Sequence, residues 1–414
     1  MTLGRPAVVV VSRYPGAPRD GGNLHAYEVA RDLARQFEFH FVCWIPEEQR
    51  LGRNEMAYLG DELGGATFVT LPMKSQMSML QRMRYLTTSM PPGCAYFDDQ
   101  IGASLRQNVA DLFKLHRPVA LHGWGPALGG CLAGHPAGNR ICTIGDAFSL
   151  AHESYARDAR ALGRVYHRHV ARKFRQHERM LVHKYDHVVA FTRRDAHALS
   201  CGGDDICHVV PNGVDEKQFF PGQASRNSTV TLSFHGVLDF PPNLEAAKFI
   251  VEELGPALES QIGADAFRIQ IIGGRAGDWL IQAAARCQWL DVSGFVEDLP
   301  QALRQTDLYL APIFTGSGIK NKVLEAMSLG LPIVGTEEAF AALDVEDGKQ
   351  CVVASRESYV AAVLNCLHSR HEMQAIGKRA SEFVDSGYRW GQVGAQYARL
   401  YRGQACHVGP GGGA

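Results

Sequence analysis

One glycine-rich segment, residues 314–332, combines side chains whose types and spacing could bind a phosphorylated ligand. It contains, in order, Gly316, Ser317, Gly318, Ile319, Lys320, Lys322 and Glu325. The segment begins where a predicted strand ends and becomes helical until Gly330 and Pro332 stop it. A helix N-terminus attracts anions, and glycines let the backbone approach one closely.

A nucleotide would satisfy both features of this segment, because its diphosphate suits the lysines and its ribose diol suits Glu325. The alternative is an ordinary glycine loop before a helix, with solvated lysines and Glu325 paired to Lys322. Short motifs often match by chance, so the position of the segment in the fold must decide between the two.

Three polar residues of the first half are further candidates. His122 and Asp146 lie at or just beyond predicted strand ends, so either could orient a bound ligand. Each could equally be structural, as a half-buried histidine or a capping aspartate, because polar groups at strand ends often satisfy backbone atoms. His25, on the first predicted helix, has the same two interpretations.

The sequence offers little support for a catalytic metal or for other nucleotide motifs. His183 and His187 are four residues apart, but neither is followed by the glutamate that metalloprotease chemistry needs. The chain has no G-x-x-x-x-G-K-[ST] loop and no G-x-S-x-G elbow. We therefore expect neither a metal nor any other cofactor.

The elements that must position these residues alternate between short apolar runs and stretches of helical period, which is typical of parallel βαβ architecture. In the first half, strands are predicted at 7–12, 37–44, 66–71, 119–122, 141–144, 187–191 and 206–210. In the second half, they are predicted at 230–234, 268–272, 290–293, 308–311, 332–335 and 351–353. The fold class is thus α/β, with two doubly wound, Rossmann-like domains.

The domain boundary is predicted at the turn Pro211-Asn212-Gly213-Val214. We predict an N-terminal domain at 1–212 and a C-terminal domain at 213–385. A last helix at 386–403 would cross back onto the first domain, and a glycine-rich tail at 404–414 would be disordered. Two such domains would place the carboxyl ends of both sheets around one cleft, where ligands bind.

The amino-acid composition excludes some classes of binding partner. The chain has 414 residues, 46% of them hydrophobic, and its 42 basic and 43 acidic side chains give a net charge of −1. A neutral chain lacks the electrostatic footprint of a nucleic-acid-binding protein. Ten cysteines without a C-x-x-C pair favour the cytoplasm, and no apolar run reaches the roughly 20 residues of a membrane span.

Two segments of the first half could contact an acceptor or a membrane. Residues 157–194 form a cationic face that could rest on an anionic membrane, although a solvated helix face explains it as well. The methionine-rich stretch 73–90 could bind an apolar acceptor or could fill irregular core space. A cytoplasmic protein with peripheral membrane contact is therefore one hypothesis.

Several short segments resemble, in order, those of glycosyltransferase family 4. They are Gly21-Gly22, Leu121-His122-Gly123-Trp124, Pro211-Asn212-Gly213-Val214-Asp215, Ile271-Ile272-Gly273-Gly274, Val292-Ser293-Gly294-Phe295-Val296, Leu324-Glu325-Ala326-Met327 and Gly330-Leu331-Pro332. The resemblance is strong over about 208–340 and looser over 1–200. It implies the GT-B fold and a retaining, metal-independent, nucleotide-sugar-dependent transferase.

The resemblance also implies that the first domain is the acceptor-side domain, where His122 or Asp146 could orient the donor sugar or the acceptor. The second domain would be the nucleotide-sugar-binding domain, and individual residues would have the following roles. Glu325 would bind the ribose hydroxyls, and Val296 would hold the base. The diphosphate would be approached by Gly21 and Gly22 of the first domain and by Gly236, Gly316, Ser317, Gly318 and Ile319 of the second. The acceptor would carry a hydroxyl, on a saccharide, a lipid-linked saccharide or a small molecule.

Two departures from the family pattern bear on catalysis. Ser317 stands where the family commonly has a second glutamate, and the segment 235–243 lacks the usual Arg and Lys clamp for the diphosphate. We predict that Lys320, Lys322 or Arg275 replaces the clamp, because leaving-group charge must be stabilised.

Three functions fit this sequence. The first is a transferase that moves a sugar from a UDP- or GDP-sugar to a hydroxyl, in bacterial polysaccharide, glycoconjugate or natural-product biosynthesis. The second is a nucleotide-sugar epimerase of the same fold. The third, motivated by the two departures, is a catalytically weakened nucleotide-sugar-binding subunit.

Overall fold

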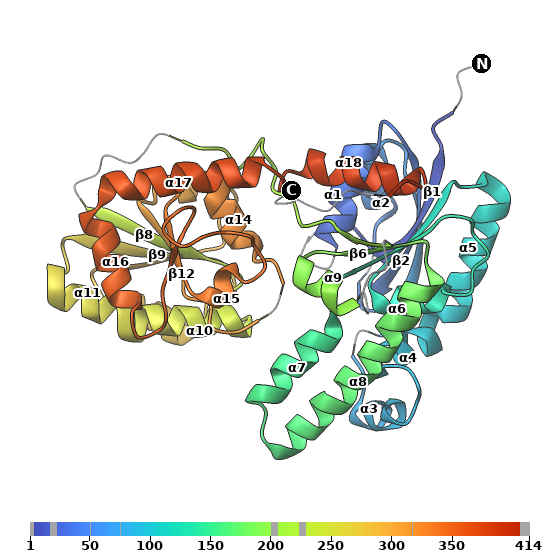
Figure 1. Ribbon diagram of the computed structural model, residues 1–414, viewed down its shortest axis with the longest axis horizontal. Coiled ribbons are helices and arrows are strands. Elements are labelled where there is room, and N and C mark those ends of the chain that lie inside the picture. The colour runs from blue at the N-terminus through green and yellow to red at the C-terminus, as the bar shows by residue number, and fades with distance from the viewer. Residues whose placement is uncertain are drawn as a thin grey trace. The chain divides into compact units, whose positions relative to one another are not determined.

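The computed structural model describes residues 4–16, 23–49, 51–74, 76–199, 206–222, 229–316 and 318–405, which divide into two compact units. Unit 1 consists of residues 1–213 and 390–414, and unit 2 consists of residues 214–389 (Figure 1). Gly21, Gly22, Ser317 and residues 406–414 of the predicted tail lie outside the described residues.

Unit 1 is built on a parallel sheet of seven strands in the order β3-β2-β1-β4-β5-β6-β7. The strands are β1 (Ala7–Arg13), β2 (Glu38–Pro46), β3 (Thr67–Met73), β4 (Ala120–Trp124), β5 (Arg140–Gly145), β6 (His187–Ala190) and β7 (Cys207–Val209). The helices are α1 (Leu24–Leu33), α2 (Arg53–Glu62), α3 (Met79–Leu86), α4 (Pro92–Phe97), η1 (Asp98–Gly102), α5 (Ala103–His116), α6 (Pro126–Leu132), α7 (Phe148–Asp158), α8 (Ala161–Lys184), α9 (Arg193–Leu199) and α18 (Trp390–Tyr401).

Helices cover both faces of this sheet, which explains the apolar runs in its strands. Along β1, Val8 and Val10 join a core that includes residues of α1 and α18, whereas Val9 and Val11 join a core with residues of α5 and α6. Successive side chains of a strand point to opposite faces, so a continuous valine run is needed to fill both cores.

Unit 2 is built on a parallel sheet of six strands in the order β10-β9-β8-β11-β12-β13. The strands are β8 (Val230–His235), β9 (Phe267–Ile272), β10 (Leu290–Gly294), β11 (Leu308–Ala311), β12 (Ile333–Gly335) and β13 (Val352–Val353). The helices are α10 (Pro241–Phe249), η2 (Ile250–Leu254), α11 (Gly255–Ile262), α12 (Asp278–Ala284), α13 (Leu299–Leu303), α14 (Asn321–Ser328), α15 (Glu337–Phe340), α16 (Tyr359–His368) and α17 (Arg370–Asp385).

The predicted α/β class is confirmed: every predicted strand overlaps an observed one, and both sheets are parallel. The last helix packs back on the first domain as predicted, because α18 lies against α1 within unit 1 (Figure 1). Its side chains Trp390, Val393, Tyr397, Leu400 and Tyr401 are buried there.

Candidate functional site

The candidate site lies in unit 2, at the point where the strand order of the sheet reverses. β8 is the first strand of the sheet in the chain and β11 the fourth, and the two are neighbours. Connections leave such a pair in opposite directions, which opens a crevice outside the carboxyl ends of the strands. The predicted segment 314–332 begins shortly after β11, so the fold places its amino-terminal part at this crevice.

The loop before α14 is shaped by glycine conformations and by Lys320. Gly316 and Gly318 have φ of 110° and 78°, in the left-handed region that favours glycine. Lys320 Nζ donates hydrogen bonds to the carbonyl oxygens of Gly316 (3.1 Å) and Gly318 (2.9 Å). The lysine therefore ties the loop to the start of α14 and adds positive charge to the helix N-terminus.

Lys322 lies in the first turn of α14 and faces the end of β8. Its Nζ donates a hydrogen bond to Oδ1 of Asn243 and lies 4.8 Å from the centre of the Phe234 ring. Burial lowers the pKa of Lys322 from 10.5 to about 7. A side chain at Gly236 would place its Cβ 2.8 Å from this Nζ, so the lysine needs a glycine there.

Glu325 is held by a relay of side chains from the two central strands. Its Oε2 lies 2.8 Å from Nε2 of His235, and Nδ1 of the same ring lies 3.0 Å from the hydroxyl of Tyr309. Burial raises the pKa of Tyr309 well above its usual value, so the hydroxyl is a neutral donor. We assign the protons accordingly: Tyr309 donates to Nδ1, and the Nε2–H donates to the carboxylate.

The carboxylate of Glu325 remains accessible to a ligand. The side chain is 24% exposed, whereas that of His235 is 6% exposed. His235 engages Oε2, and within the described residues Oε1 has no hydrogen-bond partner. The arrangement orients the carboxylate without occupying it, which suits recognition of a diol.

The loops after β9 and β10 complete this edge of the sheet. A Cβ at Gly273, whose φ is 156°, would lie 1.8 Å from the carbonyl oxygen of Gly236, so the loop after β9 touches the loop after β8 through the backbone. Arg275 has a left-handed backbone (φ 61°), and its exposed side chain pairs with Asp239 at 3.4 Å. Val296 packs partly against the core, while its neighbour Phe295 is 80% exposed.

His122 has no exposed surface, which corrects the expectation that it orients a ligand. Its Nδ1 lies 2.9 Å from the hydroxyl of Tyr401 and its Nε2 lies 2.8 Å from Oγ1 of Thr143. Thr143 in turn lies 3.0 Å from the hydroxyl of Tyr397. Both ring nitrogens are thus used inside unit 1, and α18 covers the residue.

Of the other two candidates in unit 1, His25 lies in the core and Asp146 lies at the edge of the sheet. His25 is buried, stacks on Phe191 with ring centres 4.7 Å apart and lies 2.8 Å from Asn212 Oδ1, and burial lowers its pKa to about 3. It is a neutral core residue. Asp146 follows β5 directly and is half-buried, at the carboxyl edge where a ligand could reach it.

The sequence did not single out His235, Tyr309 or Asn243. The available signal was that His235 directly follows a predicted strand of the second half, beside a glycine. His235 and Glu325 are 90 positions apart, so their contact depends on the strand order.

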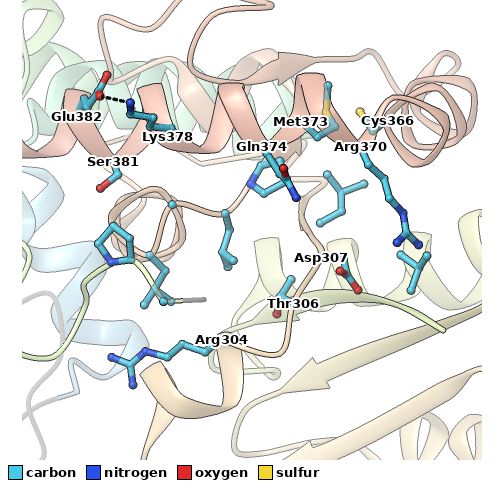
Figure 2. Close-up of a pocket in the computed structure, with 18 of the residues that line it drawn as sticks. Arg304, Thr306, Asp307, Cys366, Arg370, Met373, Gln374, Lys378, Ser381 and Glu382 are labelled. Carbon is cyan, nitrogen blue, oxygen red and sulfur yellow. Dashed lines mark ion pairs between the residues drawn. The ribbon is translucent and has the colours of Figure 1, made fainter. Parts of the chain in front are cut away.

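A cavity of about 510 Å³ lies at the opposite, amino edge of the unit 2 sheet (Figure 2). Asp307 precedes β11 and Pro332 precedes β12, and both line this cavity, together with Arg304 and Arg370. Because parallel sheets bind nucleotides at their carboxyl edge, we do not assign the donor to this cavity.

The second unit resembles a known family in sequence. Residues 229–369 match the model of the family described as glycosyl transferases group 1. A comparison with curated proteins finds no significant match. Within the described residues, no helix is long and apolar enough to cross a membrane.

The whole fold resembles those of solved enzymes of the predicted class. Sucrose-phosphate synthase from Thermosynechococcus elongatus has a TM-score of 0.67 at 13% identity, over 96% of this chain and 98% of its own. HepE from Anabaena, in complex with UDP and glucose, has a TM-score of 0.65 at 14% identity, over 96% and 100%. WaaG, a glycosyltransferase involved in lipopolysaccharide biosynthesis, has a TM-score of 0.64 at 14% identity, over 95% and 99%.

These structures share the two Rossmann-like domains of the predicted GT-B fold, so the fold prediction is confirmed over nearly the whole chain. The sequence match covers the greater part of unit 2 and includes β8, the 312–320 loop and α14. Residues 229–369 are therefore similar in sequence to the glycosyl transferases group 1 family, and the chain as a whole has the GT-B fold.

Proposed function

We propose that this protein is a retaining glycosyltransferase that moves a sugar from a UDP- or GDP-sugar to a hydroxyl acceptor. The observation that carries the proposal is the oriented Glu325 carboxylate, which lies one turn into α14 beside the glycine loop at the strand-order reversal. The family match of this region and the UDP-bound relative support it.

Each part of the site would hold one part of the donor. Glu325 would accept hydrogen bonds from the ribose hydroxyls, with His235 keeping its carboxylate oriented. The 316–320 loop and the start of α14 would receive the diphosphate, which helix N-termini and glycine backbones favour. The turn at Phe295 and Val296 would contact the base.

Lys320 and Lys322 would replace the missing clamp. Both lie at the amino end of α14, and burial makes the charge of Lys322 sensitive to its surroundings. Arg275 pairs with Asp239 on the surface and is the weaker candidate. With two lysines to neutralise the leaving diphosphate, the proposal assigns no metal and no other cofactor.

The transfer itself would break the bond between the anomeric carbon and the diphosphate oxygen. The diphosphate leaves with the electron pair, the sugar passes through an oxocarbenium-like state, and the acceptor oxygen attacks the same face while its proton passes to the departing diphosphate oxygen. Such a step needs positioning and anion stabilisation rather than a strong nucleophile. Asp146 is the candidate of the first unit that could orient the acceptor.

An exposed apolar surface on unit 1 leads us to propose a lipid-linked acceptor at an anionic membrane. On α3, Met79 and Leu80 are each 80% exposed, and on α8 Leu162 is 89% exposed. Lys173 of α8 donates a hydrogen bond to the carbonyl of Leu86 (2.7 Å), so α3 and α8 lie side by side (Figure 1). Exposed arginines on the same two helices are Arg82, Arg84, Arg164, Arg168 and Arg172, and Arg157 and Arg160 are exposed just before α8.

Apolar side chains among cations are typical of peripheral membrane binding. We therefore place the enzyme in the cytoplasm at a membrane surface, in the synthesis of a bacterial polysaccharide or glycoconjugate. Vesicles of anionic lipid should sediment the protein and neutral vesicles should not. Leu162→Glu should abolish sedimentation, whereas Leu115→Glu, at a 75% exposed position of α5, should not.

The activity is tested with a panel of UDP-, GDP- and ADP-sugars, by measuring nucleotide release with and without acceptor extracts. Acceptor-stimulated release with retained anomeric configuration supports the proposal. Isomerised sugar without acceptor would instead identify an epimerase. Binding without turnover would identify a nucleotide-sugar-binding subunit, for which the absent clamp is the motive.

A further inference from the structure

The amino edge of the unit 1 sheet carries two histidines and a glutamate that the proposed transfer does not use. Glu38 and His40 are the first and third residues of β2, so their side chains share one face of the strand. α5 packs on β2, and its last residue is His116. One ligand atom from each of these residues lies within 4.8 Å of the others.

His40 is buried with one ring nitrogen satisfied and the other not. The residue has no exposed surface, and its Nδ1 lies 2.8 Å from Oγ1 of Thr67 on the neighbouring strand β3. Its Nε2 is buried and has no hydrogen-bond partner among the described residues. The closest acid oxygen, Oε1 of Glu38, lies 3.4 Å from this nitrogen, beyond a normal hydrogen bond.

An unsatisfied buried nitrogen is rare and calls for an explanation. The two rings stack with their centres 3.7 Å apart, and His116 is only half-buried, so its ring has room to turn. A metal ion would satisfy Nε2 and recruit the other two groups.

We propose that Glu38, His40 and His116 form a zinc site with two nitrogen ligands, one carboxylate oxygen and water in the fourth position. Neutral imidazole and carboxylate suit zinc, whereas magnesium and calcium prefer sites made of oxygen alone. A ligating histidine is normally held through its other nitrogen, and Thr67 supplies that contact. The half-exposed Glu38 and the half-buried His116 leave a path for the ion.

The site would link the start of β2 to the end of α5. It lies at the amino edge of the sheet, away from the carboxyl edge where the proposed transfer takes place, so the two proposals stand independently. Its role would be to stabilise unit 1 rather than to take part in catalysis.

The test uses the whole, untagged chain freed of metal with a chelator and then titrated with Zn²⁺ and Co²⁺. The variants are Glu38→Gln and His116→Ala, because both side chains are partly exposed and their loss should spare the fold. His183→Ala is the matched control, an exposed histidine in the last turn of another helix of unit 1.

We expect one more zinc ion per chain in the parent and in His183→Ala than in either site variant. At a large excess of zinc over the dissociation constant, the parent should melt about 5 °C higher than without metal, and this gain should disappear in the site variants. Bound Co²⁺ should absorb in the visible without a thiolate charge-transfer band, which excludes the cysteines as ligands. Equal stoichiometry in the parent and the site variants, or a thiolate band, would overturn the proposal.

Discussion

At the scale of single residues, the site depends on how the structure prepares Glu325. A carboxylate on a helix surface is normally free to rotate and is fully hydrated. Here His235 fixes one oxygen at 2.8 Å, and Tyr309 fixes the histidine in turn. The order imposed before binding lowers the entropic cost of recognising a diol.

Removal of this carboxylate should weaken nucleotide binding. Glu325→Ala should cost roughly 1.5 to 3 kcal/mol, because a hydrogen bond to a charged group is lost. Calorimetric titration with UDP and GDP measures this as an increase in Kd of about ten-fold or more. Glu372→Ala, an exposed glutamate in the first turn of α17, is the control and should bind like the parent. Unchanged affinity in Glu325→Ala would remove the proposed role.

The lowered pKa of Lys322 predicts how nucleotide binding depends on pH. Its pKa of about 7 lies below the ordinary 10.5, so the unliganded chain releases this proton near neutrality. A bound diphosphate favours the charged lysine, so binding at roughly pH 8 should take up a proton, and affinity should fall as the pH rises above about 7. Calorimetry in buffers of different ionisation enthalpy measures the uptake.

Lys322→Gln should abolish that proton uptake, whereas Lys349→Gln, an exposed lysine, should leave it intact.

The same shift affects stability in the opposite sense. Between about pH 7 and pH 10.5, Lys322 keeps its proton in the unfolded chain but loses it in the folded, unliganded chain. The free energy of unfolding of the unliganded protein should therefore increase as the pH rises through this range. Binding without any dependence on Lys322 would return the clamp to Lys320 or Arg275.

At the scale of elements, the packing of α18 determines whether His122 of unit 1 is accessible to a ligand. Tyr401 and Tyr397 of this helix reach the sheet and, with Thr143, surround His122 in a closed network. The network stabilises the docking of α18, so its polar groups belong to the fold rather than to the chemistry.

Tyr401→Phe should therefore destabilise the protein without affecting nucleotide binding. The change leaves Nδ1 of His122 buried and unpaired, at a cost of about 1 to 3 kcal/mol. Unfolding in urea measures the loss. Tyr155→Phe, at a 52% exposed position of α7, should have no effect. A lower affinity for UDP at unchanged stability would show that His122 serves the site after all.

The sequence predicted the elements well because the strands of a covered parallel sheet are continuous apolar runs, as in Val8 to Val11. The sequence could not predict which side chains of a strand are covered by an element from a distant part of the chain. Tyr401 contacts His122 from 279 positions away, so a histidine in a predicted strand looked accessible when it is sealed. The orientation of Glu325 could not be predicted from the sequence either, because it depends on β8 and β11 being neighbours.

At the scale of the whole molecule, the two units differ in how the chain builds them. Unit 2 is continuous from 214 to 389, whereas unit 1 needs two separate stretches of chain. The second stretch contributes five large buried side chains through α18. At roughly 1.5 to 3 kcal/mol for each, their burial is comparable to the total stability of a domain.

A chain that stops at residue 389 should consequently lose the cooperative melting of unit 1 and keep that of unit 2. Calorimetry should show a single remaining transition, and UDP should still raise its midpoint, because the proposed nucleotide contacts of unit 2 are all present. A chain that stops at residue 405 keeps α18 and serves as the control. Two intact transitions after truncation at 389 would show that α18 is dispensable.

The discontinuity of unit 1 also has a consequence for biosynthesis. A ribosome releases the amino-terminal sheet first, yet that sheet stays without its covering helix until translation has passed residue 401. Unit 2, encoded in one piece, emerges complete while the earlier half still exposes the apolar side chains that α18 will cover. The order of maturation is thus reversed relative to the order of synthesis, and the nascent polypeptide is most vulnerable to aggregation just before its last helix appears.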